Sequence, residues 1–98
     1  MSVISTGLSG MRAAWSAMEA HASNIANVET PGYRRVVAST VAQVGGGVDT
    51  QVARAASPGA APADDLVGML AAKDSFAANL SVFRRADEAL GSLLDAVG

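Results

Sequence analysis

His21 has the side chain best suited to catalysis, because it is the only histidine in the chain. A serine nucleophile would need it as a base, together with a third group to orient the ring. The sequence has no Cys, which excludes a thiol nucleophile, a disulfide and a cysteine-based zinc site. The sequence has neither a second histidine nor a Glu-x-x-His pair, so a metal site has little support. We therefore expect a polar surface or interface residue at position 21, no cofactor and no metal, and an enzyme dependent on His21 is the weakest alternative.

The glycine run 45–47 and two arginine pairs are the other candidates for ligand binding. A phosphate-binding loop needs a Gly-x-x-x-x-Gly-Lys pattern and a following helix, and Gly45-Gly46-Gly47 has neither, so a hairpin turn is expected. Arg34-Arg35 and Arg84-Arg85 are too few for a nucleic-acid footprint in a chain of net charge −2. We expect no nucleic acid and no small-molecule substrate. The arginines either face solvent or form salt bridges to acidic neighbours in an assembly.

Residues 1–28 are predicted to form the N-terminal helix. Apolar side chains recur at alternating intervals of four and three, typical of a helix that lies along another helix. The remaining faces carry mostly Gly, Ala and Ser, with Arg12 and Glu19 as the only charges between residues 3 and 28. Such a helix is expected to pack on more than one side. The stripe consists of Ile4, Leu8, Met11, Trp15, Met18, Ala22 and Ile25.

Residues 29–63 are predicted to form a turn, a possible β-hairpin and a linker. Pro31 suits the second position of a type II turn, and Gly32 supplies the positive φ of the third. The helix must end near Asn27 or Val28, and Asn27 is a residue type that tolerates the left-handed conformation. Val- and Thr-rich runs on both sides of the glycine run predict a hairpin within 34–54, and a mobile extended segment is the alternative. Residues 55–63 have linker composition.

Residues 64–98 are predicted to form a longer C-terminal helix, with Asp64 as its N-cap and Asp65 near the positive end of the helix dipole. Its stripe has polar residues at two positions, Lys73 and Asp87. The expected fold is mainly α: two long terminal helices in a helical hairpin or coiled coil, within one domain of residues 1–98. No wholly apolar run approaches the roughly 20 residues that cross a bilayer, so no transmembrane helix is expected. The second stripe consists of Leu66, Met69, Phe76, Leu80, Phe83, Leu90, Leu94 and Val97.

Three stretches resemble the bacterial flagellar basal-body rod proteins and their hook relatives. Residues 22–35 read Ala-Ser-Asn-Ile-Ala-Asn-Val-Glu-Thr-Pro-Gly-Tyr-Arg-Arg, similar to the family signature Asn-x-x-Asn-x-x-Thr-Pro-Gly-Tyr. Residues 69–95 are similar to the C-terminal helix of the family, and residues 4–11 to its N-terminal helix. The length favours a short member, like the smallest proximal-rod proteins. The signature residues are Asn24, Asn27, Thr30, Pro31, Gly32 and Tyr33, and Asn79 belongs to the C-terminal pattern.

The resemblance implies a structural protein that polymerises through its terminal helices and contributes to motility. It implies as partners copies of the chain itself, other rod and axial proteins, and the flagellar type III export apparatus. Its expected location is the basal-body rod across the periplasm, reached without a cleaved signal peptide. Asn24 and Asn27 are expected to bond carbonyl groups at the helix end, with Tyr33 folded back onto the helix. The alternative function is a soluble helical-hairpin adaptor or export-chaperone-like module that forms a small closed oligomer.

Overall fold

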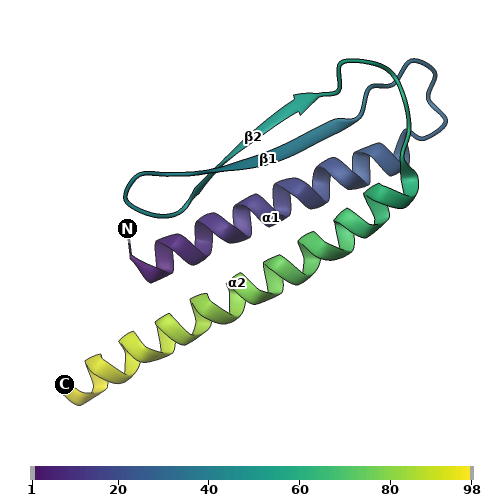
Figure 1. The fold of residues 1–98 in the computed structure, drawn as a ribbon. Helices are drawn as coiled ribbons and strands as arrows, with labels where there is room; N and C mark the ends of the chain where they lie inside the picture. The colour runs from purple at the N-terminus through teal and green to yellow at the C-terminus, as the bar shows by residue number, and fades with distance from the viewer. Residues whose placement is uncertain (1, 98) are drawn as a thin grey trace.

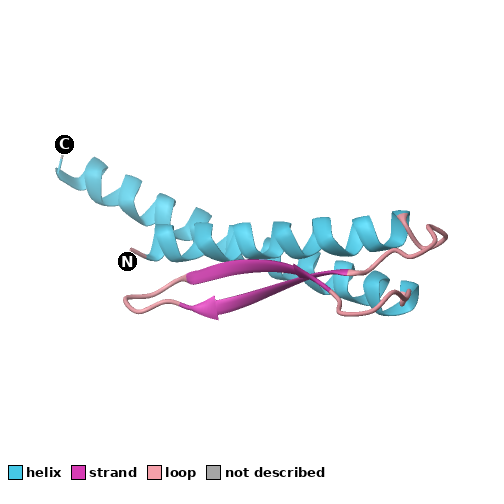
Figure 2. Ribbon diagram, turned by 90° about the horizontal axis from the view of Figure 1, so that it is seen from above, coloured by secondary structure: helices cyan, strands magenta, loops and turns pink. Residues whose placement is uncertain are grey.

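The fold consists of two long antiparallel helices joined through a two-stranded hairpin (Figure 1). A computed structural model describes residues 2–97. Helix α1 spans Val3–Ala26, strands β1 and β2 span Val36–Ala42 and Val48–Arg54, and helix α2 spans Pro62–Val97. The hairpin runs along α1 on the side away from the distal half of α2, as the view from above shows (Figure 2). The predicted fold class, mainly helical with a short hairpin between the helices, is confirmed.

Helix α1 packs on two sides, as its small residues predicted, because it contacts both α2 and the hairpin. Its buried residues are therefore mainly small: Gly7, Met11, Ala13, Ala14, Ala20 and Asn24. The predicted stripe lies at the edge of this buried surface. Met11 is buried, but Leu8 is 37% and Trp15 is 56% exposed. Leu8 and Trp15 lie at the margin because the hairpin covers the alanine face of α1.

The turn after α1 has the predicted geometry. The amide of Tyr33 donates to the carbonyl of Thr30 at 3.2 Å, which closes a turn with Pro31 and Gly32 at its centre. Gly32 has φ +73°, the value that favours glycine at the third position of a type II turn. The prediction for Asn27 was wrong in one respect. It caps α1 with φ −105°, so the helix ends without a left-handed residue.

The segment 34–54 is a hairpin and not a loose extended segment. Strands β1 and β2 pair antiparallel from Val36 opposite Arg54 to Ala42 opposite Val48. Gly45, Gly46 and Gly47 all have positive φ, so side chains at these positions would be strained. The glycine run is therefore the turn that was predicted.

Helix α2 begins two residues before the predicted boundary. Pro62 occupies its first position, where the fixed φ of proline is favourable, so Asp64 lies inside the first turn and is not the N-cap. The stripe that faces α1 includes the buried Asp65 and Ala72, with Met69, Phe76 and Phe83 half-buried between and after them. Leu66, expected on this stripe, is 52% exposed. From Asp87 to Val97 every residue of α2 is exposed.

Helix α2 is also long and apolar enough, by length and composition, to cross a membrane, and within residues 2–97 it is the one helix of this kind. The expectation of no such helix was too strict, because it considered only wholly apolar runs. A single helix of this composition is weak evidence for a membrane span, since helices in soluble proteins meet the same criterion. The finding does show how little of the apolar surface of α2 the chain covers by itself.

Candidate structural site at the closed end of the helix pair

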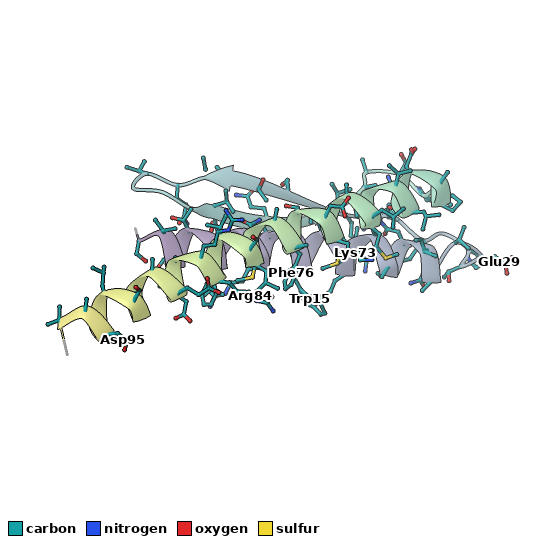
Figure 3. All side chains as sticks on the ribbon, turned by 90° about the horizontal axis from the view of Figure 1, so that it is seen from below. Trp15, Glu29, Lys73, Phe76, Arg84 and Asp95 are labelled. Carbon is teal, nitrogen blue, oxygen red and sulfur yellow. The ribbon has the colours of Figure 1, made fainter. Side chains whose placement is uncertain are left out.

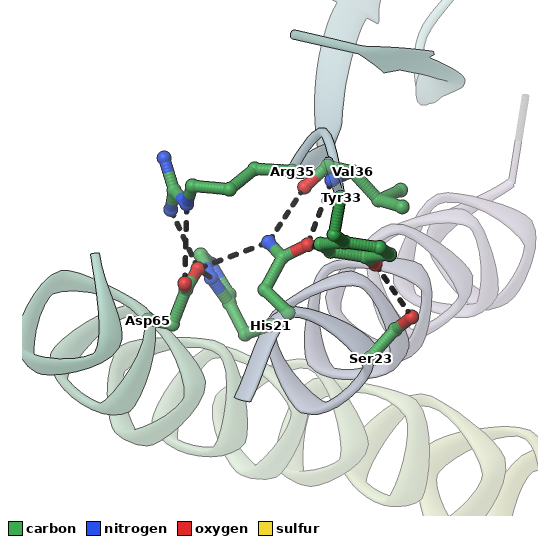
Figure 4. A network of polar contacts seen from close by, with 7 residues as sticks. His21, Ser23, Tyr33, Arg35, Val36 and Asp65 are labelled. Atoms are coloured by element: carbon green, nitrogen blue, oxygen red, sulfur yellow. Dashed lines mark hydrogen bonds and ion pairs between the residues drawn. The ribbon is translucent and has the colours of Figure 1, made fainter. Parts of the chain in front are cut away.

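Asp65 is the centre of a polar network at the end where the two helices are joined (Figure 4). Its side chain is 1% exposed. Arg35 donates two hydrogen bonds to it, from Nη2 at 2.6 Å and from Nε at 3.1 Å. Asn24 donates a third at 3.1 Å, and Nδ1 of His21 lies 2.9 Å from Oδ1. This Asp65 network, formed by His21, Asn24, Arg35 and Asp65, connects α1, the entry to β1 and the first turn of α2.

The network stabilises the ionised form of the buried carboxylate. Burial by itself raises the pKa of Asp65, but hydrogen bonds from Arg35, then His21, then Asn24 outweigh burial and lower the pKa from 3.8 to about 2. The hydrogen bond to Asp65 likewise raises the pKa of the Arg35 guanidinium. A bidentate Arg–carboxylate pair of this kind fixes orientation as well as charge. The carboxylate therefore remains ionised at neutral pH and holds its three partners in place.

The contacts of His21 assign it a structural position. Because the carboxylate of Asp65 only accepts hydrogen bonds, Nδ1 of His21 is the donor. The other edge of the ring lies against the backbone of α2 at Gly68, so closely that a Cβ there would overlap it. The Asp65 carboxylate accepts from His21 and also from Arg35 in a bidentate pair, so it connects the two side chains. No group of three or more potential metal ligands occurs among residues 2–97.

Two polar side chains of α1 attach the hairpin to the helix. Asn24 accepts from the amide of Val36 at 2.7 Å and donates to its carbonyl at 2.8 Å. Ser9 accepts from the amide of Val48 at 2.7 Å and donates to its carbonyl at 3.2 Å. Val36 and Val48 are the first residues of β1 and β2. Each end of the hairpin is thus fixed to α1 by a side chain that satisfies both backbone groups of one residue.

The signature residues form the turn and support this attachment. Asn27 donates to the carbonyl of Ser23 at 2.9 Å, which is the predicted bond at the helix end. Asn24 does not bond a helix carbonyl as predicted, because the start of β1 lies closer and offers both an amide and a carbonyl. Tyr33 folds back onto α1 as predicted. Its hydroxyl lies 2.9 Å from the Ser23 hydroxyl and donates to Asn24 at 3.3 Å.

The signature also includes Thr30 and Pro31. Thr30 donates to the side chain of Asn27 at 3.1 Å. Pro31 is exposed at the tip of the turn. The structure therefore brings Asn24, Asn27, Thr30 and Tyr33 together around the end of α1.

The predicted helix-packing residues divide into paired and unpaired sets. Trp15 and Phe76 contact each other across the helices, with ring centroids 6.4 Å apart. Gly7 lies close to the backbone and Cβ of Phe83, and Gly10 packs against the side chain of Asn79. Four further members are half-buried, namely Ile4, Met18, Ile25 and Leu80. Leu90 and Leu94 remain exposed at 48% and 64%.

An open hollow of about 680 Å³ lies between the helices and the hairpin. Small residues of both helices form most of it, among them Gly10, Ala14, Ala17, Gly68 and Ala72. Its polar groups are partly engaged already, since Ser9 holds Val48 and His21 holds Asp65. The hollow results from the small residues that let the two helices approach each other.

Asp65 and Arg35 are members of this site that the sequence did not predict. The sequence predicts Asp65 only near the positive end of the helix dipole, and it predicts Arg35 either in solvent or in a salt bridge within an assembly. One signal was available. Position 65 begins the repeat 65, 69, 72, 76, 79, 83 and 86, so an acid stood on the stripe that faces α1. Acidic residues are rarely buried unless they are paired. An acid at position 65 therefore indicates a basic partner elsewhere in the chain.

Comparison with known families gives a match to the N-terminal third of the chain. Residues 4–34 match the family model described as flagella basal body rod protein. The matched segment covers α1 and the turn, and so includes His21, Asn24 and the signature up to Arg34, whereas Arg35 and Asp65 lie outside it. Among curated proteins no match was found. The match confirms the resemblance over residues 4–11 and 22–34, so this segment is similar to flagellar basal body rod proteins, whereas the resemblance of residues 69–95 lies outside it.

Proposed function

We propose that this chain, which carries the N-terminal segment of the flagellar basal body rod family, is a structural subunit that polymerises through its two terminal helices. One observation carries the proposal beyond the family match. The stripe of α2 that faces α1 continues as exposed Leu90, Leu93 and Val97 after α1 has ended. A subunit that leaves its own interface unfinished in this way requires another chain to complete it.

The burial of the whole chain supports the same conclusion. Among the described residues the buried apolar ones are Met11 and four alanines. Large apolar side chains such as Trp15, Leu70 and Leu93 are more than half exposed. Burying an apolar side chain of this size contributes roughly 1.5–3 kcal/mol. The largest remaining gain in stability is therefore the association of α1 and α2 with neighbouring helices.

The shape of the molecule suits lateral packing. Its extents are 61 × 25 × 14 Å, so most side chains of the helices lie near a long flank. Contacts that use two different surfaces generate open helical assemblies when the rotation does not close. Stiffness of such an assembly would come from helices packed side by side, and this is the property that a rod transmitting torque needs.

The proposal includes partners and a route. We propose that the subunit contacts copies of itself and other rod and axial proteins, that the flagellar type III apparatus exports it without cleavage of a signal peptide, and that it contributes to motility. The Asp65 network then has a structural role. It fixes the closed end of the helix pair, so that the distal part of α2 projects in a defined direction.

Deletion of the coding sequence in the source bacterium tests the proposal. We expect loss of swimming and basal bodies without a complete rod, with both restored by the wild-type chain. Normal swimming with intact rods would contradict it. The adaptor alternative predicts a different result in solution. Light scattering at high concentration would then show a discrete dimer or tetramer and no longer assemblies.

A further inference from the structure

The distal part of α2 is an apolar helix with no partner in the chain. It extends past the N-terminus of α1 (Figure 1), and all its residues from Asp87 to Val97 are exposed. We name this segment, residues 87–97, the overhang. Leu90 is 48%, Leu93 and Leu94 are each 64%, and Val97 is 87% exposed. Because positions 90, 93, 94 and 97 share one helix face, the overhang presents a continuous apolar surface about 11 Å long.

A groove on the helix pair has the complementary character. It has a volume of about 500 Å³ and is lined by Leu8, Met11, Arg12, Trp15 and Phe76. Trp15 is 56% exposed there, although it contacts Phe76. Both rings lie on the edge of the helix pair away from the hairpin (Figure 3). The Trp15 groove, as we name it, is therefore an apolar surface that no other part of the chain covers.

The charges of the two surfaces are opposite. Arg12 lines the Trp15 groove, and Lys73 and Arg84 lie on the same face of α2 as Phe76 (Figure 3). Glu19 lies one helical turn from Trp15 on α1 and also lines a hollow beside the hairpin, so one acidic residue stands against these three basic ones. The overhang carries Asp87, Glu88 and Asp95 and no basic residue. Opposite charges around two apolar surfaces favour one register and suppress others.

The overhang cannot reach the groove of its own molecule. Gly10 packs against Asn79, so the groove lies at the level of that residue along α2. Asp95 is 16 residues further along the same helix, a separation of about 24 Å. Only the overhang of another copy can enter the groove.

We propose that the overhang of one copy docks in the Trp15 groove of the next. The apolar face of the overhang, formed by Leu90, Leu93, Leu94 and Val97, then packs against Trp15 and Phe76. This contact deepens the proposed polymerisation, on which it rests, by naming the two surfaces. An amphipathic helix in an apolar groove is a common mode of recognition. Because donor and acceptor surfaces differ, every copy can give one contact and receive one. The overhang points along the long axis, so successive contacts extend the assembly along this axis.

Disulfide trapping between two single-cysteine variants tests the docking. The chain has no cysteine, so Leu8→Cys mixed with Leu94→Cys reports only contacts between copies. Leu8→Cys mixed with Val44→Cys is the matched control, because Val44 is fully exposed at the hairpin tip. We expect the 8–94 disulfide to exceed the 8–44 product at least about tenfold under mild oxidation. A disulfide requires Cα atoms within about 7 Å, so equal yields would overturn the proposal.

Charge reversal separates the specific contact from general apolar adhesion. In the Leu94→Cys variant, added Asp87→Lys and Asp95→Lys should lower the 8–94 yield several-fold. Added Arg12→Glu and Lys73→Glu in the Leu8→Cys variant should restore it. Failure of the restoration would show that the two surfaces attract each other without the proposed register, and would also overturn the proposal. Circular dichroism of each variant establishes that it is folded before mixing.

The outcomes distinguish the docking from the rod function. Trapping in solution together with normal swimming of the deletion strain would retain the docking and reject the rod function. Loss of rods in the deletion strain together with equal yields of the 8–94 and 8–44 disulfides would retain the rod function. In that case the overhang must be covered by a different rod protein, and the proposed contact between copies is wrong.

Discussion

Arg35 donates two hydrogen bonds to Asp65, of 2.6 and 3.1 Å, although 30 residues and the whole hairpin separate the two residues in the chain. The pair therefore fixes where the chain enters β1 relative to where it enters α2. His21 and Asn24 add α1 to the same carboxylate. One buried charge thus connects the three segments that meet at the closed end of the molecule.

Replacing the central carboxylate tests its contribution to stability. Asp65→Asn removes the charge and replaces one of the two acceptor oxygens by an NH2 donor, so Arg35 loses its bidentate partner. We expect a loss of about 2–3 kcal/mol in the free energy of unfolding, because one partner of a buried charge pair is removed while Arg35 and His21 keep partial access to water. Urea unfolding followed by circular dichroism measures it. Asp64→Asn, in the same turn but exposed, is the matched control, and an equal effect of both changes would refute this role.

The lowered pKa of Asp65 predicts how stability depends on pH. The folded chain has a pKa of about 2 at this position against an ordinary value of 3.8, so between these values the unfolded chain binds the proton more readily. The stabilisation is complete above about pH 5 and is lost progressively as the pH falls towards 2. Its size is about 2–3 kcal/mol. Urea midpoints between pH 2 and 7 should fall more steeply for the wild type than for Asp65→Asn, and parallel curves would count against the network.

The same glycine-to-alanine change at two positions of α2 should have opposite effects. At Gly68 a Cβ would overlap the ring of His21, which Asp65 holds in place, so we expect Gly68→Ala to destabilise the fold by about 1–3 kcal/mol. At Gly91 nothing lies within 4 Å of a Cβ. Gly91→Ala should stabilise by about 0.5–1 kcal/mol through helix propensity alone. Thermal unfolding of both variants checks the signs, and stabilisation by both would mean that the His21 contact is loose.

Ser9 should control the local stability of one end of the hairpin. Ser9→Ala removes the acceptor of the Val48 amide and the donor to its carbonyl. Because a lost hydrogen bond of this kind costs about 1 kcal/mol, the Val48 amide should exchange with solvent about five- to tenfold faster. Hydrogen exchange by NMR measures this rate. Ser81→Ala on the exposed face of α2 should leave the rate unchanged, and a Val48 rate that is unaffected by Ser9→Ala would argue against the attachment.

Much of the architecture could be predicted because its signals are local. Proline and glycine at 31 and 32 determine the turn, and three glycines with Val-rich flanks determine the hairpin. The alternating spacing of apolar residues identifies both helices. The face that each helix buries was less predictable, because it depends on what packs against it. Leu8 and Trp15 lie at the margin since the hairpin occupies the alanine side of α1.

The Asp65 network was the least predictable part because its members are far apart in sequence. His21 and Asp65 are 44 residues apart, and no short spacing links them. Asp64 is the same residue type as Asp65 and also lies in the first turn of α2, near the positive end of the helix dipole, yet it is exposed. What separates the two is one residue of helical rotation, about 100°, which turns position 65 towards α1 and position 64 to solvent.

Imaging of labelled basal bodies tests the central claim most directly. A short epitope inserted at Gly46, in the exposed turn of the hairpin, leaves both helices and the Asp65 network unchanged. After complementation of the deletion strain, purified basal bodies are decorated with a gold-labelled antibody. The account predicts gold along the rod in strains that swim. Swimming cells whose purified basal bodies carry no label, while the tagged chain stays in the cytoplasmic fraction, would contradict it.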